Sequence, residues 1–222
     1  MPKQTFINLD EAKRKQITDA FLQEFAVNSF DEASLSEVVK RLGIAKGSVY
    51  QYFGGKLDLF MYLVELCSSV KIRYVASIKR ENFPDYWAYF RNLFEQGYEF
   101  DHENPLESHF LHRLSHNLNS PSVKDLFSHL QEQTVSAFEK MVAYEVEQGL
   151  FRDDVPFGTM GFLLYRVGAS IQEQLEYSGE INPEESINQH IPVYQGKKAL
   201  LMKTVDDYIN LSRPAFDKPT IS

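Results

Sequence analysis

The sequence of 222 residues has a single cysteine, Cys67, and its net charge is −8. One cysteine excludes an internal disulfide and a zinc site made of four thiolates, and it fits a reducing compartment. The longest apolar-leaning run, residues 155–165, is about half as long as a membrane span, and Arg166 follows it. The first 15 residues lack the apolar core of a signal peptide. We therefore expect a cytoplasmic protein that has no membrane partner.

Motifs of catalysis are also missing. The sequence has no glycine-rich phosphate loop, no Gly-x-Ser-x-Gly elbow and no arrangement of paired carboxylates. We therefore expect no enzymatic activity and no cofactor. The composition, 43% hydrophobic and 24% charged, is that of an ordinary globular chain with enough apolar material for a core.

The acidic excess is unevenly distributed. Residues 1–60 hold eight Lys or Arg and eight Asp or Glu, so the whole net charge of −8 lies in the remaining 162 residues. A net acidic chain argues against nucleic acid as a partner, whereas such asymmetry is expected when only the first part meets DNA. The charge pattern permits DNA binding without establishing it.

Apolar residues recur at helical spacing nearly throughout, and no segment reads convincingly as a strand, which predicts an all-α protein. Ser34 and Glu37 form a capping-box pattern before a short helix, and Gly43 after that helix suits a left-handed cap. Residues 178–194 are expected to form a loop with one turn of helix. The expected helices span about 9–27, 35–42, 45–53, 56 into the seventies, 83–100, from 105, 121–148, 156–177 and 197–211.

A short helix, a glycine-marked turn and a second short helix form a helix-turn-helix layout, in which the second helix enters the major groove. The stretch LGIAKGSVYQYFGGK, residues 42–56, suits that role. Its lysines and phenols can bind phosphates, and its glutamine can meet a base edge. On spacing alone, a plain helical hairpin with a solvated face is an equally good interpretation.

Residues 17–60 resemble the N-terminal domain of TetR-family transcriptional regulators. That family's pattern is Gly-Val/Ile-Ser-x-Gly-Ser/Thr-Leu/Val-Tyr-x-His/Tyr-Phe-x-x-Lys. Ala45 departs from it, because the family usually has a Ser or Thr there that caps the helix. Nine positions agree in register: Gly43, Ile44, Gly47, Ser48, Val49, Tyr50, Tyr52, Phe53 and Lys56.

The resemblance implies a three-helix DNA-binding domain over residues 1–56 and a helical ligand-binding and dimerisation domain over residues 57–222. It implies a ligand-responsive regulator, most often a repressor, that binds a near-palindromic operator in double-stranded DNA as a homodimer. A small-molecule effector would release it, and helices at 156–177 and 197–211 would form the dimer interface. Val49 and Phe53 would pack inward. The residues expected at DNA are Ser34, Lys46, Gly47, Ser48, Tyr50, Gln51, Tyr52 and Lys56.

An aromatic face at residues 83–100 is a second candidate site. By itself this pattern is more typical of core packing, but the resemblance favours the wall of an effector cavity. Glu95 and Glu99 would then favour a cationic aromatic ligand. The residues expected to line the cavity are Tyr86, Phe90, Phe94, Phe110 and Tyr165.

Two other interpretations are open. A helical ligand-binding adaptor without a DNA role would keep the cavity and tolerate changes at Tyr50. A metal-binding helical protein would use His109, His112 and His116, the last two at the i, i+4 spacing of metal ligands. Because no Glu or Cys partner accompanies them, surface or pocket-lining histidines are the commoner explanation.

Overall fold

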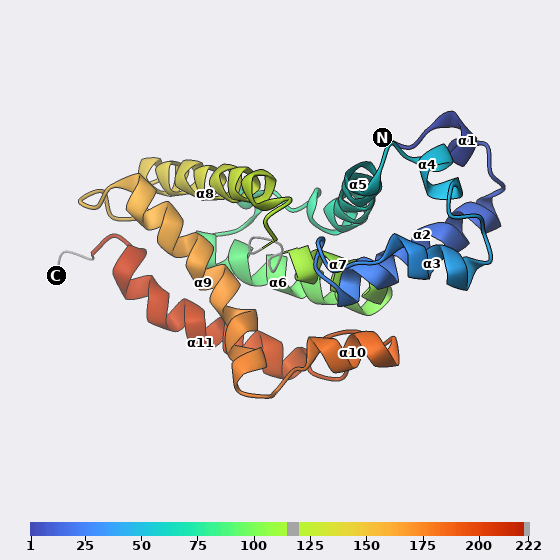
Figure 1. The fold of residues 1–222 in the computed structure, drawn as a ribbon. Helices are drawn as coiled ribbons and strands as arrows, with labels where there is room; N and C mark the ends of the chain where they lie inside the picture. The colour runs from blue at the N-terminus through green and yellow to red at the C-terminus, as the bar shows by residue number, and fades with distance from the viewer. Residues whose placement is uncertain (115–119, 220–222) are drawn as a thin grey trace. The chain divides into compact units, whose positions relative to one another are not determined.

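The computed structural model describes residues 1–114 and 120–219, and these form helices joined by turns (Figure 1). The one β-type pairing in this part of the chain is an isolated antiparallel bridge between Phe151 and Asp217. The all-α prediction is confirmed. In the same residues, no helix is both long enough and apolar enough to cross a bilayer. The chain divides into two compact units, and neither is continuous in sequence.

The first unit contains residues 1–74, 100–124 and 183–193. Its central helix is α2, which packs against α3, α7 and α10. On its inner side, Phe25 meets Phe60 of α5 with ring centroids 5.0 Å apart, and Phe60 meets Phe110 of α7 at 5.6 Å. The helices of this unit are α1 (Gln4–Ile7), α2 (Glu11–Val27), α3 (Leu35–Leu42), α4 (Ser48–Tyr52), α5 (Lys56–Val75), α7 (Pro105–Leu114) and α10 (Pro183–Gln189).

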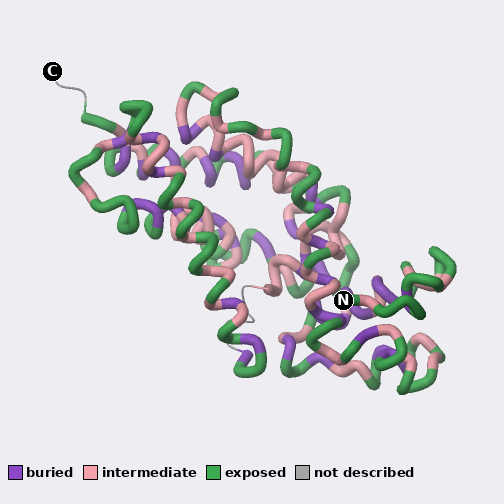
Figure 2. The backbone as a smooth tube through the Cα atoms, turned by 90° about the horizontal axis from the view of Figure 1, so that it is seen from above, coloured by how far each residue is buried: buried purple, intermediate pink, exposed green. Residues whose placement is uncertain are grey.

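The second unit contains residues 75–99, 125–182 and 194–222. Its helices are η1 (Arg80–Asn82), most of α6 (Tyr86–Glu103), α8 (Lys124–Glu147), α9 (Phe157–Tyr177) and α11 (Lys198–Phe216). Trp87 is the centre of its aromatic core, with ring centroids 5.1 Å from Tyr86, 5.9 Å from Phe151 and 5.8 Å from Phe216. Its indole N–H donates to a carboxylate oxygen of Asp217 at 2.7 Å. In Figure 2 the buried positions recur along the helices, with exposed positions between them, as amphipathic helices require.

Several boundaries differ from those predicted. The short helix α1 was not expected, and α10 is longer than the one turn of helix expected within residues 178–194. The helix expected from residue 121 begins at Lys124, after a turn. The last helix continues to Phe216, because its end pairs with residues 150–152 through the bonds Arg152 N–H to Phe216 O and Lys218 N–H to Leu150 O, both 2.9 Å.

Candidate nucleic-acid interface

The turn between α3 and α4 is closed by Gly43. This residue has a φ of 64°, the left-handed conformation, and its N–H donates to Lys40 O at 3.2 Å. The next N–H, of Ile44, reaches back to Val39 O at 3.1 Å. The predicted glycine cap is therefore confirmed, and it sets the direction in which the chain enters α4.

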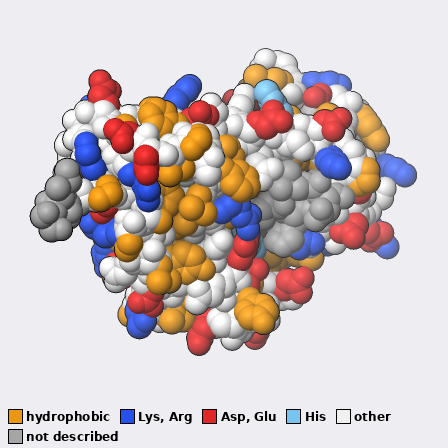
Figure 3. All heavy atoms as spheres, turned by 90° about the vertical axis from the view of Figure 1, so that its left-hand side faces the viewer, with side chains coloured by type: hydrophobic (Ala, Val, Ile, Leu, Met, Phe, Trp, Pro, Cys, Tyr) orange, Lys and Arg blue, Asp and Glu red, His pale blue; other side chains and the backbone are white. Residues whose placement is uncertain are grey.

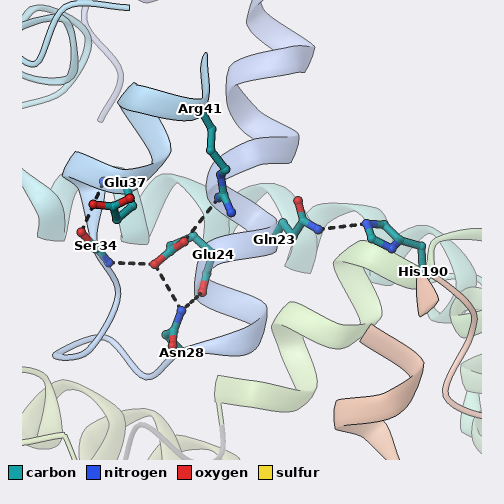
Figure 4. Close-up of polar contacts among 7 residues, drawn as sticks. All are labelled: Gln23, Glu24, Asn28, Ser34, Glu37, Arg41 and His190. Carbon is teal, nitrogen blue, oxygen red and sulfur yellow. Dashed lines mark hydrogen bonds and ion pairs between the residues drawn. The ribbon is translucent and has the colours of Figure 1, made fainter. Parts of the chain in front are cut away.

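The start of α3 is held by the carboxylate of Glu24 on α2 (Figure 4). Ser34 caps α3, because its hydroxyl accepts from the Glu37 N–H at 3.4 Å, as predicted. The second bond of the predicted capping box, from the Ser34 N–H to the Glu37 carboxylate, is wrong. The Ser34 N–H donates instead to Glu24 at 2.9 Å, and the same carboxylate accepts from Asn28 at 3.2 Å and from Arg41 at 3.3 Å.

Glu24 was missed from the sequence because nothing local distinguishes it from Glu11 and Asp19, the other acidic residues of α2. It is 9% exposed. A carboxylate so buried is tolerated because it is fully hydrogen-bonded. Here it ties together the end of α2, the turn that follows and α3, which are the elements that support α4.

The inner face of α4 packs into the first unit as the resemblance implied: Val49 is 2% exposed and Phe53 is fully buried. Its outer face carries Tyr50, which is 58% exposed, and Gln51, which is also exposed. Exposed Lys46 stands in the turn just before the helix. A phenol, an amide and an ammonium group on one short surface can bind phosphate oxygens and base edges.

The other residues predicted at DNA lie around this surface. Gly47 is exposed, and Ser48 is half-buried at the start of α4. Tyr52 is also half-buried, and its ring packs 5.7 Å from that of Phe6. Their contacts with DNA stay predictions.

Lys56 is engaged inside the first unit. Its ammonium donates to Ala33 O at 2.6 Å and to Asp31 O at 3.4 Å, and it lies 5.0 Å from the ring centroid of Phe30. Partial burial lowers the pKa of Lys56 from its ordinary value. The group therefore braces the turn after α2 in this structure, and a role at phosphate stays a prediction.

The candidate effector residues are divided between the two units. Tyr86 and Phe90 are 1% and 3% exposed in the aromatic core of the second unit, where burial raises the pKa of Tyr86. Phe94 and Tyr165 are only half-buried, and the Tyr165 hydroxyl accepts from Gln131 at 3.0 Å. The binding of a ligand by any of these residues stays a prediction.

Phe110, in contrast, is fully buried in the first unit, against Phe60. The acidic pair that was expected to attract a cationic ligand already binds a cation of the chain. The ammonium of Lys198 lies 2.6 Å from Glu99 and 3.4 Å from Glu95. It also lies 5.2 Å from the ring centroid of Tyr98.

The histidines do not form a metal site in the part of the chain that is described, where no three His, Cys, Asp or Glu side chains are placed to hold an ion. His109 is 2% exposed, and its Nε2 lies 2.9 Å from Ile191 O, to which it donates. His112 is half-buried, and His116 lies outside the described residues.

Comparison with known proteins matches residues 17–63 to the family described as bacterial regulatory proteins, tetR family. The matched segment includes the Glu24-bound turn and the whole of α3 and α4. The chain is a TetR-family helix-turn-helix transcriptional regulator. Since this is a family of transcription regulators, the protein is classed with DNA-binding proteins and not with enzymes.

Two individual similarities extend this result. The regulator SrpR of Pseudomonas putida is 35% identical over 49 residues, which are 22% of this chain and 23% of SrpR. The similarity therefore spans less than a quarter of the length of that relative. A TetR-family regulator from Chloroflexus aurantiacus J-10-FL is 26% identical, with a TM-score of 0.80 over 99% of this chain and 100% of that one.

More distant structures share the fold alone. One is a transcriptional regulator from Saccharomonospora viridis in complex with choline, 15% identical, with a TM-score of 0.55 over 94% of this chain and 99% of that chain.

Proposed function

We propose that this protein is a ligand-responsive transcriptional repressor that binds a near-palindromic operator as a homodimer and releases it when a small molecule binds among the C-terminal helices. The observation that carries the DNA role is the outer face of α4, where Tyr50 is 58% exposed beside Gln51 on a helix otherwise anchored by buried Val49 and Phe53. This face belongs to the segment that matches the tetR family.

The dimer is supported by apolar side chains that α9 and α11 leave exposed. These two helices pack against each other, and the Tyr208 hydroxyl of α11 donates to Ser170 O of α9 at 3.3 Å. Figure 3 shows exposed hydrophobic side chains gathered near the middle of one view, among charged ones. The exposed apolar side chains of α9 and α11 include Phe157 at 37%, Phe162 at 52%, Leu163 at 46% and Leu211 at 80%.

A second copy of the chain, related to the first by a two-fold axis, would cover these apolar side chains. The same axis would place two α4 helices on one operator. Gly161 of α9 lies against α8 of the same chain. A Cβ atom there would lie 2.7 Å from the backbone nitrogen of Glu139, so the close approach that this glycine permits is with α8 of the same chain. The residues after it, Phe162 and Leu163, are the exposed ones.

Release requires that the effector bind the DNA-incompetent state more tightly than the competent one. Inside the first unit, α7 packs on α2, and its Phe110 contacts Phe60 of α5. A displacement of α5 or α7 by a ligand would therefore reach α2 directly, because packed helices move together. The choline complex of the distant relative shows a small molecule bound to a protein of this fold.

The test is selection of an operator from random duplexes by the wild-type chain, by Tyr50→Ala/Gln51→Ala and by the control Gln148→Ala, which changes an exposed glutamine in the turn just after α8. We expect wild type and control to enrich the same near-palindrome and the double variant to enrich none. If the double variant enriches it equally well, α4 does not read DNA. A wild-type protein that runs as a monomer at micromolar concentration in sedimentation would refute the dimer.

A further inference from the structure

Helix α1 lies against the end of α4 within the first unit. Its anchor is Phe6, which is 1% exposed and has ring centroids 4.8 Å from Phe53, 5.7 Å from Tyr52 and 5.6 Å from Tyr62 of α5. A helix of four residues cannot persist on its own. The contacts of Phe6 therefore hold this segment in place.

The segment supplies donors to the last three carbonyl groups of α4. The Lys3 N–H donates to Tyr52 O at 2.7 Å, and the Lys3 ammonium donates to Tyr50 O at 2.7 Å. The Thr5 hydroxyl donates to Gln51 O. The end of a helix leaves such carbonyls without an intrahelical partner. Every one of the three thus receives a donor from the same four-residue stretch, Lys3 to Phe6.

Apart from the burial of Val49 and Phe53, helix α4 has few features of its own that fix its position. It is five residues long, its N-terminus has no side-chain cap, and Ala45 stands where a capping Ser or Thr would be expected. The N–H of Gly54, which would continue the helix by bonding to Tyr50 O, donates instead to the Asp58 carboxylate at 3.1 Å. The helix therefore depends on neighbouring segments for its position.

We propose that Lys3, Thr5 and Phe6 form a clasp that positions α4 for DNA and so determines operator affinity without touching the bases. This inference rests on the proposed role of α4 in binding DNA. The positive charge of Lys3 also suits the negative end of the α4 dipole. The clasp lies before residue 17, where the family match begins, so it is an addition to the matched domain.

A positioning element acts on the fraction of molecules in which α4 is ready to bind. When that fraction falls, the apparent dissociation constant rises by the inverse of the fraction. Binding to random DNA, which depends on charge alone, does not change. This difference separates a clasp from a direct phosphate contact by Lys3.

The experiment measures operator affinity by fluorescence anisotropy at several salt concentrations for the full chain and for Thr5→Val, Lys3→Met and Lys3→Arg. The control Lys13→Met removes the same charge from α2, where the side chain bonds only to Gln16 of its own helix among the described contacts. We expect Thr5→Val and Lys3→Met each to weaken operator binding about fivefold, the effect of one lost hydrogen bond. Lys3→Arg should restore it, and the salt slope and random-duplex affinity should stay those of wild type.

Three results would overturn the clasp. If Lys3→Met lowers the salt slope by about 0.9 and weakens random-duplex binding equally, Lys3 contacts a phosphate. If both variants bind the operator as wild type does, the bonds to α4 have no role in affinity. If circular dichroism shows that partial unfolding at the assay temperature accounts for the loss, the segment is merely structural. A wild-type protein that enriches no operator would instead refute the proposed function.

Discussion

Replacing Lys56 with methionine separates a structural role from a DNA-binding role at one residue. Methionine keeps most of the aliphatic stem but removes the ammonium, its bond to Ala33 O at 2.6 Å and its position over the Phe30 ring at 5.0 Å. A hydrogen bond from a charged group contributes about 1.5–3 kcal/mol, and an exposed cation–π contact about 0.5–1 kcal/mol. Partial burial, which lowers the pKa of Lys56, offsets part of this, so we expect a net loss of about 2 kcal/mol.

For a chain of this length, 1 kcal/mol shifts the melting temperature by about 2–4 °C. Lys56→Met should therefore melt about 4–8 °C below wild type in differential scanning fluorimetry. The matched control is Lys46→Met, because Lys46 is exposed in the turn before α4. It should leave the melting temperature unchanged and lower the salt slope of operator binding by about 0.9, the effect of one lost phosphate contact.

The opposite pattern would refute this reasoning. If Lys56→Met melts within 1 °C of wild type, on the order of a quarter of the expected shift, the bond to Ala33 O contributes nothing to stability. If its salt slope also falls, the ammonium of Lys56 leaves the turn and binds a phosphate, as the family resemblance implied.

Three further predictions concern stability measured by urea unfolding. Glu24→Gln should lower the free energy of unfolding by about 2 kcal/mol, because it leaves donors of the α2–α3 turn unpaired. The control Glu37→Gln, at an exposed residue, should change it little. Equal effects would contradict the role of the buried carboxylate. Gly161→Ala should lose about 1–3 kcal/mol, since its Cβ would lie 2.7 Å from a backbone nitrogen of α8, while Gly158→Ala, with 3.8 Å of room, should be neutral or stabilising. Burial lowers the pKa of His109 below 6.5, so the unfolded chain binds a proton more readily below that pH and stability falls as the pH drops from 7 to 5.5. His109→Gln should lessen that fall, and an unchanged pH dependence would show that His109 is not its source.

The elements that the sequence predicted are those with strong local signals. Helix α3 has a capping serine at one end and a left-handed glycine at the other, and both work as expected. The long amphipathic helices were found because their apolar residues repeat with the helical period. The surface proposed to bind DNA was predicted from a resemblance at nine positions in one short stretch.

The features that were missed depend on contacts distant in sequence. Helix α1 is too short to show a period, and it is held by residues about 46 positions away, such as Thr5 with Gln51. Helix α10 was expected only as one turn, because it lies in a stretch rich in Asn, Glu and Pro, and it is held by α2 and α7. Glu99 binds Lys198, which lies 99 positions away in the sequence. The sequence alone could not show this pair, so the Glu99 carboxylate was expected to attract a cationic ligand.

The packing of residues 183–193 determines with which helices this segment should unfold locally. It lies in sequence between α9 and α11, yet it belongs to the first unit, where Val193 N–H donates to Asp101 at 3.2 Å and Gln23 bonds to His190 at 2.9 Å. Amide protons exchange in cooperative blocks that follow packing and not chain order. Residues 183–193 should therefore exchange with α2 and α7, as a separate block from the helices on either side of them. A recombinant fragment that stops at residue 74 would lack this block. A chimera that exchanges α9 and α11 with those of a relative would have to keep residues 183–193 with the first unit.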